Sequence, residues 1–367
     1  MKPKPFVCVL AFALLAVTSA AFAATTWYVD GVNGSDSNNC KSPTTACKTI
    51  GHAISLASSG DSISVAAATY AENLTIGINL KVIGASAVTT IIDGRRLSTV
   101  VTISSTSAHV ILSSLTIQNG LLTAIAAFGG GIHNSGTLTI NNSTLSANSA
   151  VGTAGVVGAL GGGIYNSGTL TINNSTLSGN TATNAIGGTA DGGGIYNGNG
   201  VVAINNSTLS GNTASIGGGI YTFGHSVTIN NSTLSGNSAV AVGGIYKLVE
   251  FTAVTITNSI VADNSGGNCA SSITSNGYNL SSDDSCNFSG PGDMNNTDPM
   301  LGTLGYHGGR TQTIPLLGSS PAIDAGNPNG CTDDKGNRLK TDQRGAPRPD
   351  PEDTGGCDMG AYESQAD

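Results

Sequence analysis

Aromatic side chains recur at one position of a phrase that this chain repeats five times. Each follows an isoleucine preceded by glycines, and successive side chains of a strand point to opposite faces. If the isoleucines point inward, the aromatic side chains point outward and stack rung upon rung over roughly 20 Å, at about 4.8 Å per rung. They are His133, Tyr165, Tyr196, Tyr221 and Tyr246. Because aromatic faces suit contact with sugar rings, this column is our candidate ligand-binding strip. The alternative is a ladder of rings that only stabilises its own neighbours.

Charged side chains, which the cleavage of a polysaccharide needs, are nearly absent from the repeats. Between Gly120 and Tyr246 the only Asp, Glu, Lys or Arg is Asp191. Glycoside hydrolysis uses two carboxyl groups that flank the scissile bond. Lyase chemistry of this kind uses carboxylates that hold Ca²⁺ and a base that removes a proton. We therefore predict no catalytic residues and no metal ligands in this part of the chain.

The repeats themselves indicate the elements that position the aromatic column. The glycine-led isoleucines are Ile132, Ile164, Ile195, Ile220 and Ile245, so the steps are 32, 31, 25 and 25 residues. A period in this range predicts a solenoid whose repeats stack to bury one continuous core. The repeats are rich in Gly, Asn, Thr and Ser, which are poor helix formers, and their apolar residues alternate with period two. We therefore expect strands.

A change of parity locates one corner of each coil. In the first copy Leu138 and Ile140 share even parity, whereas Leu145 is odd. For all three to point inward, the chain must turn at Asn141 and Asn142, and Asn tolerates left-handed backbone angles. Stacked asparagines at this corner can bond one another along the axis. The sequence therefore predicts three short strands per coil, which is a parallel β-helix.

These residues resemble the right-handed parallel β-helix superfamily typified by pectin lyases. The paired phrases GGGI(Y/H) and LSxN are similar to the repeats of polymorphic outer membrane proteins, which usually carry Phe where this chain has leucine. Those leucines are Leu145, Leu177, Leu209 and Leu234. The resemblance covers about a third of the chain (residues 129–264) and implies an all-β, right-handed parallel β-helix. Since the superfamily contains polysaccharide lyases and glycosidases, it also keeps an enzyme open as an alternative.

The N-terminus has the features of a secretory signal peptide over residues 1–23. Lys2 and Lys4 precede an apolar run, and Ala21-Phe22-Ala23 forms a cleavage site. We therefore expect a secreted, extracellular or cell-surface protein with no membrane span after signal removal. The β-helix then occupies residues 24–264. Its first part, 24–70, is an N-terminal cap with a strand at 25–28 and a short helix at 48–58 that covers the open end of the sheets.

Charge and cysteine content restrict the partners. Removing Lys2 and Lys4 from 14 basic residues leaves 12 against 22 acidic ones, a net charge of −10. We therefore exclude nucleic acid as a partner. Six cysteines remain, and in an exported chain they favour disulfides over a zinc site, although six allow 15 pairings. They form three sequence-local couples, Cys40 with Cys47, Cys269 with Cys286, and Cys331 with Cys357.

Composition changes after residue 264, where charges and prolines concentrate. The tail carries GYNL at 277–280, DPMLG at 298–302, SPAIDAG at 320–326, DQRG at 342–345 and CDMGAYE at 357–363. This ordered set resembles the choice-of-anchor Q domain of exported β-helix proteins and implies a loop-rich domain over 265–367. Its charged residues are Asp324, Asp342, Arg344, Arg348, Asp358 and Glu363. We expect them to form a salt-bridged network that closes the C-terminal end of the solenoid, with a functional site as the alternative.

No cofactor is expected. Asp333 and Asp334 with Asn337 offer oxygen ligands for Ca²⁺, but their spacing is not that of an EF-hand loop. The sequence thus predicts an exported, non-catalytic β-helix protein that acts in adhesion or in binding a polysaccharide or cell-surface glycan. The alternative is a divergent polysaccharide lyase or glycosidase, for which the superfamily is the only warrant.

Overall fold

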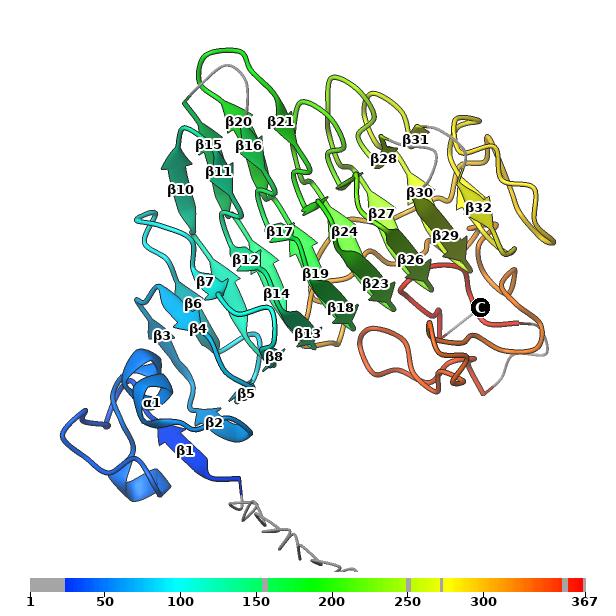
Figure 1. Cartoon of the computed structure of the whole chain (residues 1–367). Coiled ribbons are helices and arrows are strands. Elements are labelled where there is room, and N and C mark those ends of the chain that lie inside the picture. Colours follow the sequence, from blue (N-terminus) through cyan, green and yellow to red (C-terminus); the bar gives the residue numbers. More distant parts are fainter. Residues whose placement is uncertain (1–23, 154–157, 249–251, 271–272, 352–355, 366–367) are drawn as a thin grey trace, which may run out of the picture.

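The computed structural model describes residues 24–153, 158–248, 252–270, 273–351 and 356–365, so the predicted signal peptide lies outside the described residues. The chain winds into a right-handed parallel β-helix, as predicted, and Figure 1 shows its coils stacked along one axis. Three long sheets of 10, 9 and 8 strands run along that axis, and every strand pair in them is parallel. In the part of the chain that the structure describes, no helix has the length and apolar character to cross a membrane.

The strands of each coil pass from the third sheet to the first and then to the second. The first sheet contains β1 (Thr26–Val29), β2 (Asp61–Val65), β5 (Leu80–Gly84), β8 (His109–Ser113), β13 (Thr137–Asn141), β18 (Thr169–Asn173), β23 (Val201–Asn205), β26 (Ser226–Asn230), β29 (Ala253–Thr257) and β32 (Thr274–Ser275). The second contains β3 (Ala68–Tyr70), β6 (Thr90–Asp93), β9 (Thr116–Gln118), β14 (Thr144–Ser146), β19 (Thr176–Ser178), β24 (Thr208–Ser210), β27 (Thr233–Ser235), β30 (Ile260–Ala262) and β33 (Leu280–Ser281). The third contains β4 (Leu74–Ile76), β7 (Val101–Ile103), β12 (Ile132–Asn134), β17 (Ile164–Asn166), β22 (Ile195–Asn197), β25 (Ile220–Thr222), β28 (Ile245–Lys247) and β31 (Cys269–Ala270).

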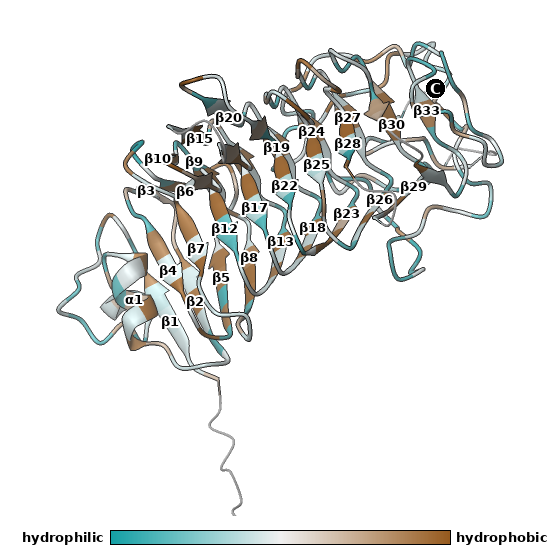
Figure 2. Ribbon diagram, turned by 45° about the horizontal axis from the view of Figure 1, so that its top comes forward, coloured by the Kyte–Doolittle hydropathy of each residue, from teal (hydrophilic) through white to brown (hydrophobic). Residues whose placement is uncertain are grey.

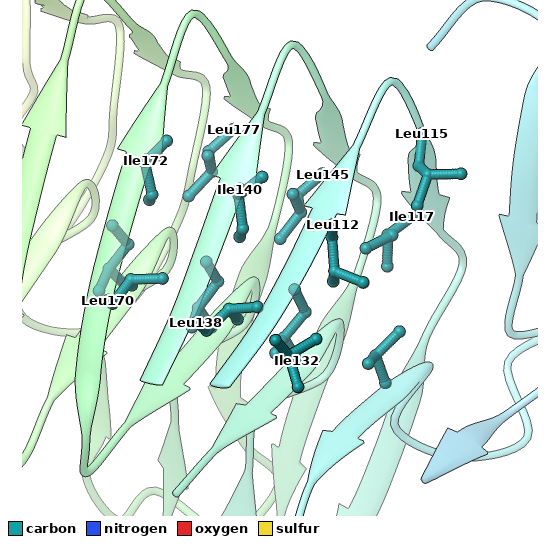
Figure 3. Packing of buried hydrophobic residues seen from close by; sticks show 14 of the residues in the cluster. Leu112, Leu115, Ile117, Ile132, Leu138, Ile140, Leu145, Leu170, Ile172 and Leu177 are labelled. Carbon is teal, nitrogen blue, oxygen red and sulfur yellow. The ribbon is translucent and has the colours of Figure 1, made fainter. Parts of the chain in front are cut away.

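The core is a set of aliphatic columns inside these sheets. Leu138 pairs with Leu170 and Ile140 with Ile172 in register, and all four are fully buried. Figure 3 shows such side chains pointing from facing strands into the enclosed space, and Figure 2 shows hydrophobic colour on strands such as β5, β7 and β8. Each fully buried Leu or Ile contributes about 1.5–3 kcal/mol relative to an exposed one. The period-two pattern therefore sets which face is the core.

The predicted asparagine corner is confirmed. Its residues have left-handed φ values of 48° to 52° in five successive coils, at Asn142, Asn174, Asn206, Asn231 and Asn258. Asn206 Nδ2 donates to Asn174 Oδ1 at 2.7 Å, so the side chains do bond along the axis. A serine after each corner accepts the backbone N–H of the previous coil, as Ser175 Oγ does from Ser143 at 3.1 Å. We call this line of residues the asparagine corner.

A second line of asparagines, which sequence analysis missed, is fully or almost fully buried. Each amide donates to the next side-chain oxygen at 2.9–3.0 Å, through Asn148, Asn180, Asn212, Asn237, Asn264 and Asn268. Asn180 Nδ2 also donates to the carbonyl of Leu145 at 3.0 Å. The side-chain amides in this line of asparagines thereby have hydrogen-bond partners, as burial requires. This explains why the phrase LSxN ends on Asn.

The longer repeat steps build a lobe on the side of the solenoid that the sequence did not predict. Two three-stranded sheets form it: β10 (Leu121–Ala124), β15 (Ser149–Gly152) and β20 (Thr181–Asn184), and β11 (Ala127–Phe128), β16 (Ala159–Leu160) and β21 (Ala190–Asp191). The lobe has its own small core of alanines, which include Ala127, Ala159 and Ala190. The 25-residue steps are shorter and carry only isolated bridges here. We call this part the side lobe.

The N-terminal end is covered by helix α1 (Ile50–Leu56), close to the predicted 48–58, after a 3₁₀ turn at Pro43–Thr45. Thr49 caps the helix by accepting the N–H of His52 at 3.2 Å. Glu72 accepts the N–H groups of Ile50 and Gly51 at 2.9 and 2.7 Å, where the helix dipole favours a negative charge. In Figure 1, α1 lies beside β1 and β2 at the end of the stack.

The C-terminal segment differs from the expectation in two ways. Strands β31, β32 and β33 continue the three sheets past the predicted boundary at residue 264. The rest of the described chain has isolated bridges but no strand, and it folds back along the asparagine corner (Figure 1). There Thr208 Oγ1 donates to Gln343 Oε1 at 2.7 Å, and Asn231 Nδ2 donates to the Thr332 carbonyl at 2.7 Å. The segment therefore flanks several coils and does not only close the end.

Candidate functional site

The structure brings the five predicted strip residues together in one column on the outer face of the third sheet. They are paired in register along β12, β17, β22, β25 and β28. Successive ring centroids are 5.0, 5.6, 5.1 and 5.3 Å apart from His133 to Tyr246. We call this column the aromatic ladder.

Ring orientation decides what a ligand would meet. The planes of Tyr165 and Tyr196 differ by 6°, those of Tyr196 and Tyr221 by 7°, and those of Tyr221 and Tyr246 by 15°. Each inner ring therefore covers the faces of its neighbours, and such stacking adds about 0.5–1.5 kcal/mol per pair. The inner faces are not free to receive a sugar ring, which the sequence hypothesis had assumed. The ladder presents ring edges and hydroxyl groups instead.

The hydroxyl groups of the four tyrosines have no hydrogen-bond partner among the described residues. Tyr165, Tyr196 and Tyr246 are half-buried, whereas Tyr221 is buried. Burial of the rings raises the pKa of Tyr196 to about 12 and also raises the pKa of Tyr165 and Tyr221. Each of these hydroxyls thus stays protonated at neutral pH and both donates and accepts.

The side lobe supplies a second column next to the ladder. Phe128, Leu160 and Asp191 are paired in register on β11, β16 and β21. The residue before each of them belongs to the alanine core of the lobe, so alternation turns these three side chains the other way. The Phe128 ring shows the direction, because its centroid lies 4.9 Å from that of Tyr165. Asp191 therefore sits at the register position that faces the ladder.

Asp191 is the unusual member of this column. It is only 6% exposed, and its Oδ1 is buried without a hydrogen-bond partner among the described residues. Burial raises the pKa of Asp191 to about 6, and its charge contributes to the raised pKa of Tyr196 and Tyr221. An unpaired buried carboxyl is costly to the fold and is the kind of group that marks a functional site. It can donate or accept a proton near neutral pH.

The sequence analysis named Asp191 as an isolated charged residue within the repeats but did not assign it to a site, and it missed Phe128. The signal was present, because Phe128, Leu160 and Asp191 each immediately precede a run of three glycines. The glycines make the turn from the lobe to the third sheet. A Cβ on Gly130 would lie 2.4 Å from the backbone of Ser149, so the close approach requires glycine.

Disulfides connect the six cysteines in the expected couples, Cys40–Cys47, Cys269–Cys286 and Cys331–Cys357. In the described part of the chain, His52 lies close enough to Cys40 and Cys47 to form a group of potential metal ligands. Both sulfurs are already bonded to each other, so this group offers no thiolate ligands.

The predicted charge network is placed as follows. Arg344 Nε lies 2.7 Å from Asp342 Oδ2, and Arg348 Nε lies 2.6 Å from Glu363 Oε2. Asp358 Oδ1 accepts the N–H of Asp324 at 2.8 Å. Burial raises the pKa of Glu363 to about 7, although Arg348 and the backbone of Asp358 act against this.

These groups hold the C-terminal segment together and against the solenoid, since Arg348 Nη1 also donates to Asn206 Oδ1 at 3.1 Å. The acids of the Ca²⁺ hypothesis are likewise engaged within the protein. Asp333 accepts the Asn337 N–H at 2.8 Å, and Asp334 Oδ1 accepts from Asn205 Nδ2 at 2.8 Å.

The fold and the site together define a class, a disulfide-bonded parallel β-helix with an external aromatic ladder. No protein-family model matches the chain, and no curated protein matches it. Pectin methylesterases are among the solved structures that match. A mutant in complex with a hexasaccharide is 16% identical, with 88% of this chain and 95% of that chain covered and a TM-score of 0.38.

Pectin methylesterase PemA from Erwinia chrysanthemi is 15% identical, with 82% of this chain and 86% of that chain covered and a TM-score of 0.36. A second hexasaccharide complex is 15% identical, with 88% and 95% covered and a TM-score of 0.37. Likeness at this level says nothing about activity. The parallel β-helix rests on the strand pairing of this chain itself.

Proposed function

We propose that this protein is an exported β-helix that binds polysaccharide along the aromatic ladder without cleaving it. The observation that carries the proposal is the row of four tyrosine hydroxyls, which have no hydrogen-bond partner among the described residues. The four rings that carry them are stacked, with successive ring centroids 5.1–5.6 Å apart. A preformed row of donors and acceptors costs little ordering entropy on binding.

A linear polysaccharide fits this row because it presents hydroxyl groups at regular intervals along an extended chain. The ladder is roughly 20 Å long, so several sugar units can bind at once. Solenoids offer extended binding surfaces of this kind. The repeats carry a single ionisable acid, Asp191, and no Lys or Arg between Gly120 and Tyr246. The contact surface therefore favours hydrogen bonding over charge attraction.

The setting supports an extracellular role. Three disulfides are typical of proteins from oxidising compartments. The signal-peptide features of residues 1–23 point the same way, as do the resemblances to polymorphic outer membrane protein repeats and to the choice-of-anchor Q domain. Adhesion to a glycan-bearing surface is the role that we infer from this combination.

The second candidate is a polysaccharide lyase or glycosidase, and Asp191 is the observation that favours it. A carboxyl group with a pKa of about 6 is suited to general acid chemistry. A glycosidase, however, needs a second carboxyl group about 5–9.5 Å away. No other Asp or Glu occurs between Gly120 and Tyr246. We therefore place binding first.

A glycan-array screen of residues 24–367, followed by product analysis on every retained polysaccharide, separates the two candidates. Retention without new reducing or unsaturated ends is the expected result. Cleavage that is lost in Asp191→Asn would replace the binding proposal with the enzyme. A chain that retains no polysaccharide at all would refute both.

A further inference from the structure

The asparagine corner has two halves that differ in what satisfies their amide groups. In the coils of Asn206, Asn231 and Asn258, main-chain carbonyls of the C-terminal segment accept from Nδ2. The distances are 3.2, 2.7 and 2.8 Å, in that order. In this half of the corner, the protein's own carbonyl oxygens accept hydrogen bonds from the asparagine amides.

The other half of the corner faces a cavity of about 360 Å³. The cavity lies between Ser114, Asn142 and Asn174 on one side and the C-terminal segment on the other, which contributes Gly308, Arg310, Thr311 and residues 341–345. Within the described residues, Asn174 Nδ2 and both polar atoms of the Asn142 side chain have no hydrogen bond. The same kind of donor therefore lacks here the carbonyl acceptor that it has from Asn206 onward.

One positive charge lines this cavity without a counterion. Arg344 is neutralised by Asp342 at 2.7 Å and packs over the Tyr362 ring at 3.5 Å. Arg310 is exposed, and its Nη1 donates a long hydrogen bond of 3.4 Å to the carbonyl of Ala85. It forms no ion pair with any described residue. A guanidinium group in this position is free to bind a carboxylate with two parallel hydrogen bonds.

We propose that this cavity binds an acidic sugar, a polyhydroxylated ligand that carries a carboxylate. Arg310 holds the carboxylate, and the amides of Asn142 and Asn174 donate to ligand hydroxyl or ring oxygens, as they do to carbonyls elsewhere on the corner. The cavity volume lies within the usual range for small-ligand sites. The site is separate from the aromatic ladder, which lies on the third sheet, whereas this corner joins the first sheet to the second.

The test is isothermal titration calorimetry of the protein with glucuronate and with glucose, which differ in the carboxylate. We expect measurable binding of glucuronate and at least tenfold weaker binding of glucose. Arg310→Gln should weaken glucuronate binding at least tenfold, because hydrogen bonds to charged groups are the strong ones. Asn142→Gly, which keeps the left-handed corner backbone, should weaken it severalfold.

Arg96→Gln is the matched control, since Arg96 is an exposed arginine at a turn outside the cavity. It should leave the affinity unchanged, and all variants should melt at the temperature of the parent protein. Glucuronate that binds equally to the parent and Arg310→Gln would overturn the proposal, as would an absence of any carboxylate binding. A parallel titration with a di- or tri-uronate shows whether the natural ligand is a polymer or a free acidic sugar. Tighter binding than free glucuronate indicates a polymer, and equal binding indicates a free acid.

Discussion

Replacing Asp191 by Asn should stabilise the protein at neutral pH and should do so less at acidic pH. Asp191 is 6% exposed, and burial raises its pKa from 3.8 to about 6. Between these two values the folded chain binds more protons at this site than the unfolded chain does. The stability that this site contributes is therefore greatest below pH 3.8 and is lost as the pH rises from 3.8 through about 6.

The size of the effect follows from the pKa difference. A shift of about two units at roughly 1.4 kcal/mol per unit gives about 3 kcal/mol of lost stability at pH 7.5. Asparagine has a similar shape and no charge to desolvate. We therefore expect Asp191→Asn to be more stable than the parent by up to about 3 kcal/mol at pH 7.5 and by little at pH 4.

Urea denaturation followed by circular dichroism at both pH values measures this difference. Asp284→Asn, which removes an exposed loop carboxylate, is the control and should have the same small effect at both pH values. A gain from Asp191→Asn that is equal at pH 4 and pH 7.5, or no gain at all, would refute the view that this carboxyl is desolvated and unpaired in the folded state.

Two further predictions concern the stability of the fold. Asn212→Ala should cost at least about 2 kcal/mol in thermal or urea denaturation, because it leaves buried donors of Asn180 without their acceptor, whereas exposed Asn199→Ala should cost little. Replacing both Cys331 and Cys357 by Ala should lower the free energy of unfolding of the C-terminal segment by about 3–4 kcal/mol, because the two cysteines are 26 residues apart in the sequence. In limited proteolysis, the segment beyond residue 281 should then be cleaved earlier than the solenoid. A double variant as resistant to the protease as the parent protein would contradict this.

Local periodicity predicted the solenoid because each coil repeats the same short-range constraints. The parity change between Ile140 and Leu145 placed the turn at Asn142, where the structure has φ of 49°. The aromatic ladder followed from the same alternation, since Tyr165 and Tyr196 occupy equivalent strand positions. These inferences needed only the two-residue period of a strand and the stacking of equal coils.

The features that escaped prediction depend on contacts between residues far apart in the sequence. The difference between 32- and 25-residue steps signalled inserted residues, but not that they form a lobe that turns Asp191 toward the ladder. Likewise the fold-back of the C-terminal segment joins Thr176 to Gln312, whose pairing no local pattern records. The mutual stacking of the tyrosine rings depends on rotamers, which spacing alone does not determine.

The central claim is that the ladder hydroxyls bind polysaccharide, and one variant tests it most directly. Replacing Tyr165, Tyr196 and Tyr246 together by Phe keeps the stacked rings and removes three hydroxyl groups. At about 0.5–1.5 kcal/mol per hydrogen bond, retention on the polysaccharide identified by the array should weaken at least tenfold. The melting temperature should not fall, because the removed groups have no partners among the described residues. Unchanged affinity in a folded triple variant would contradict the account and leave the ladder as a purely stabilising structure.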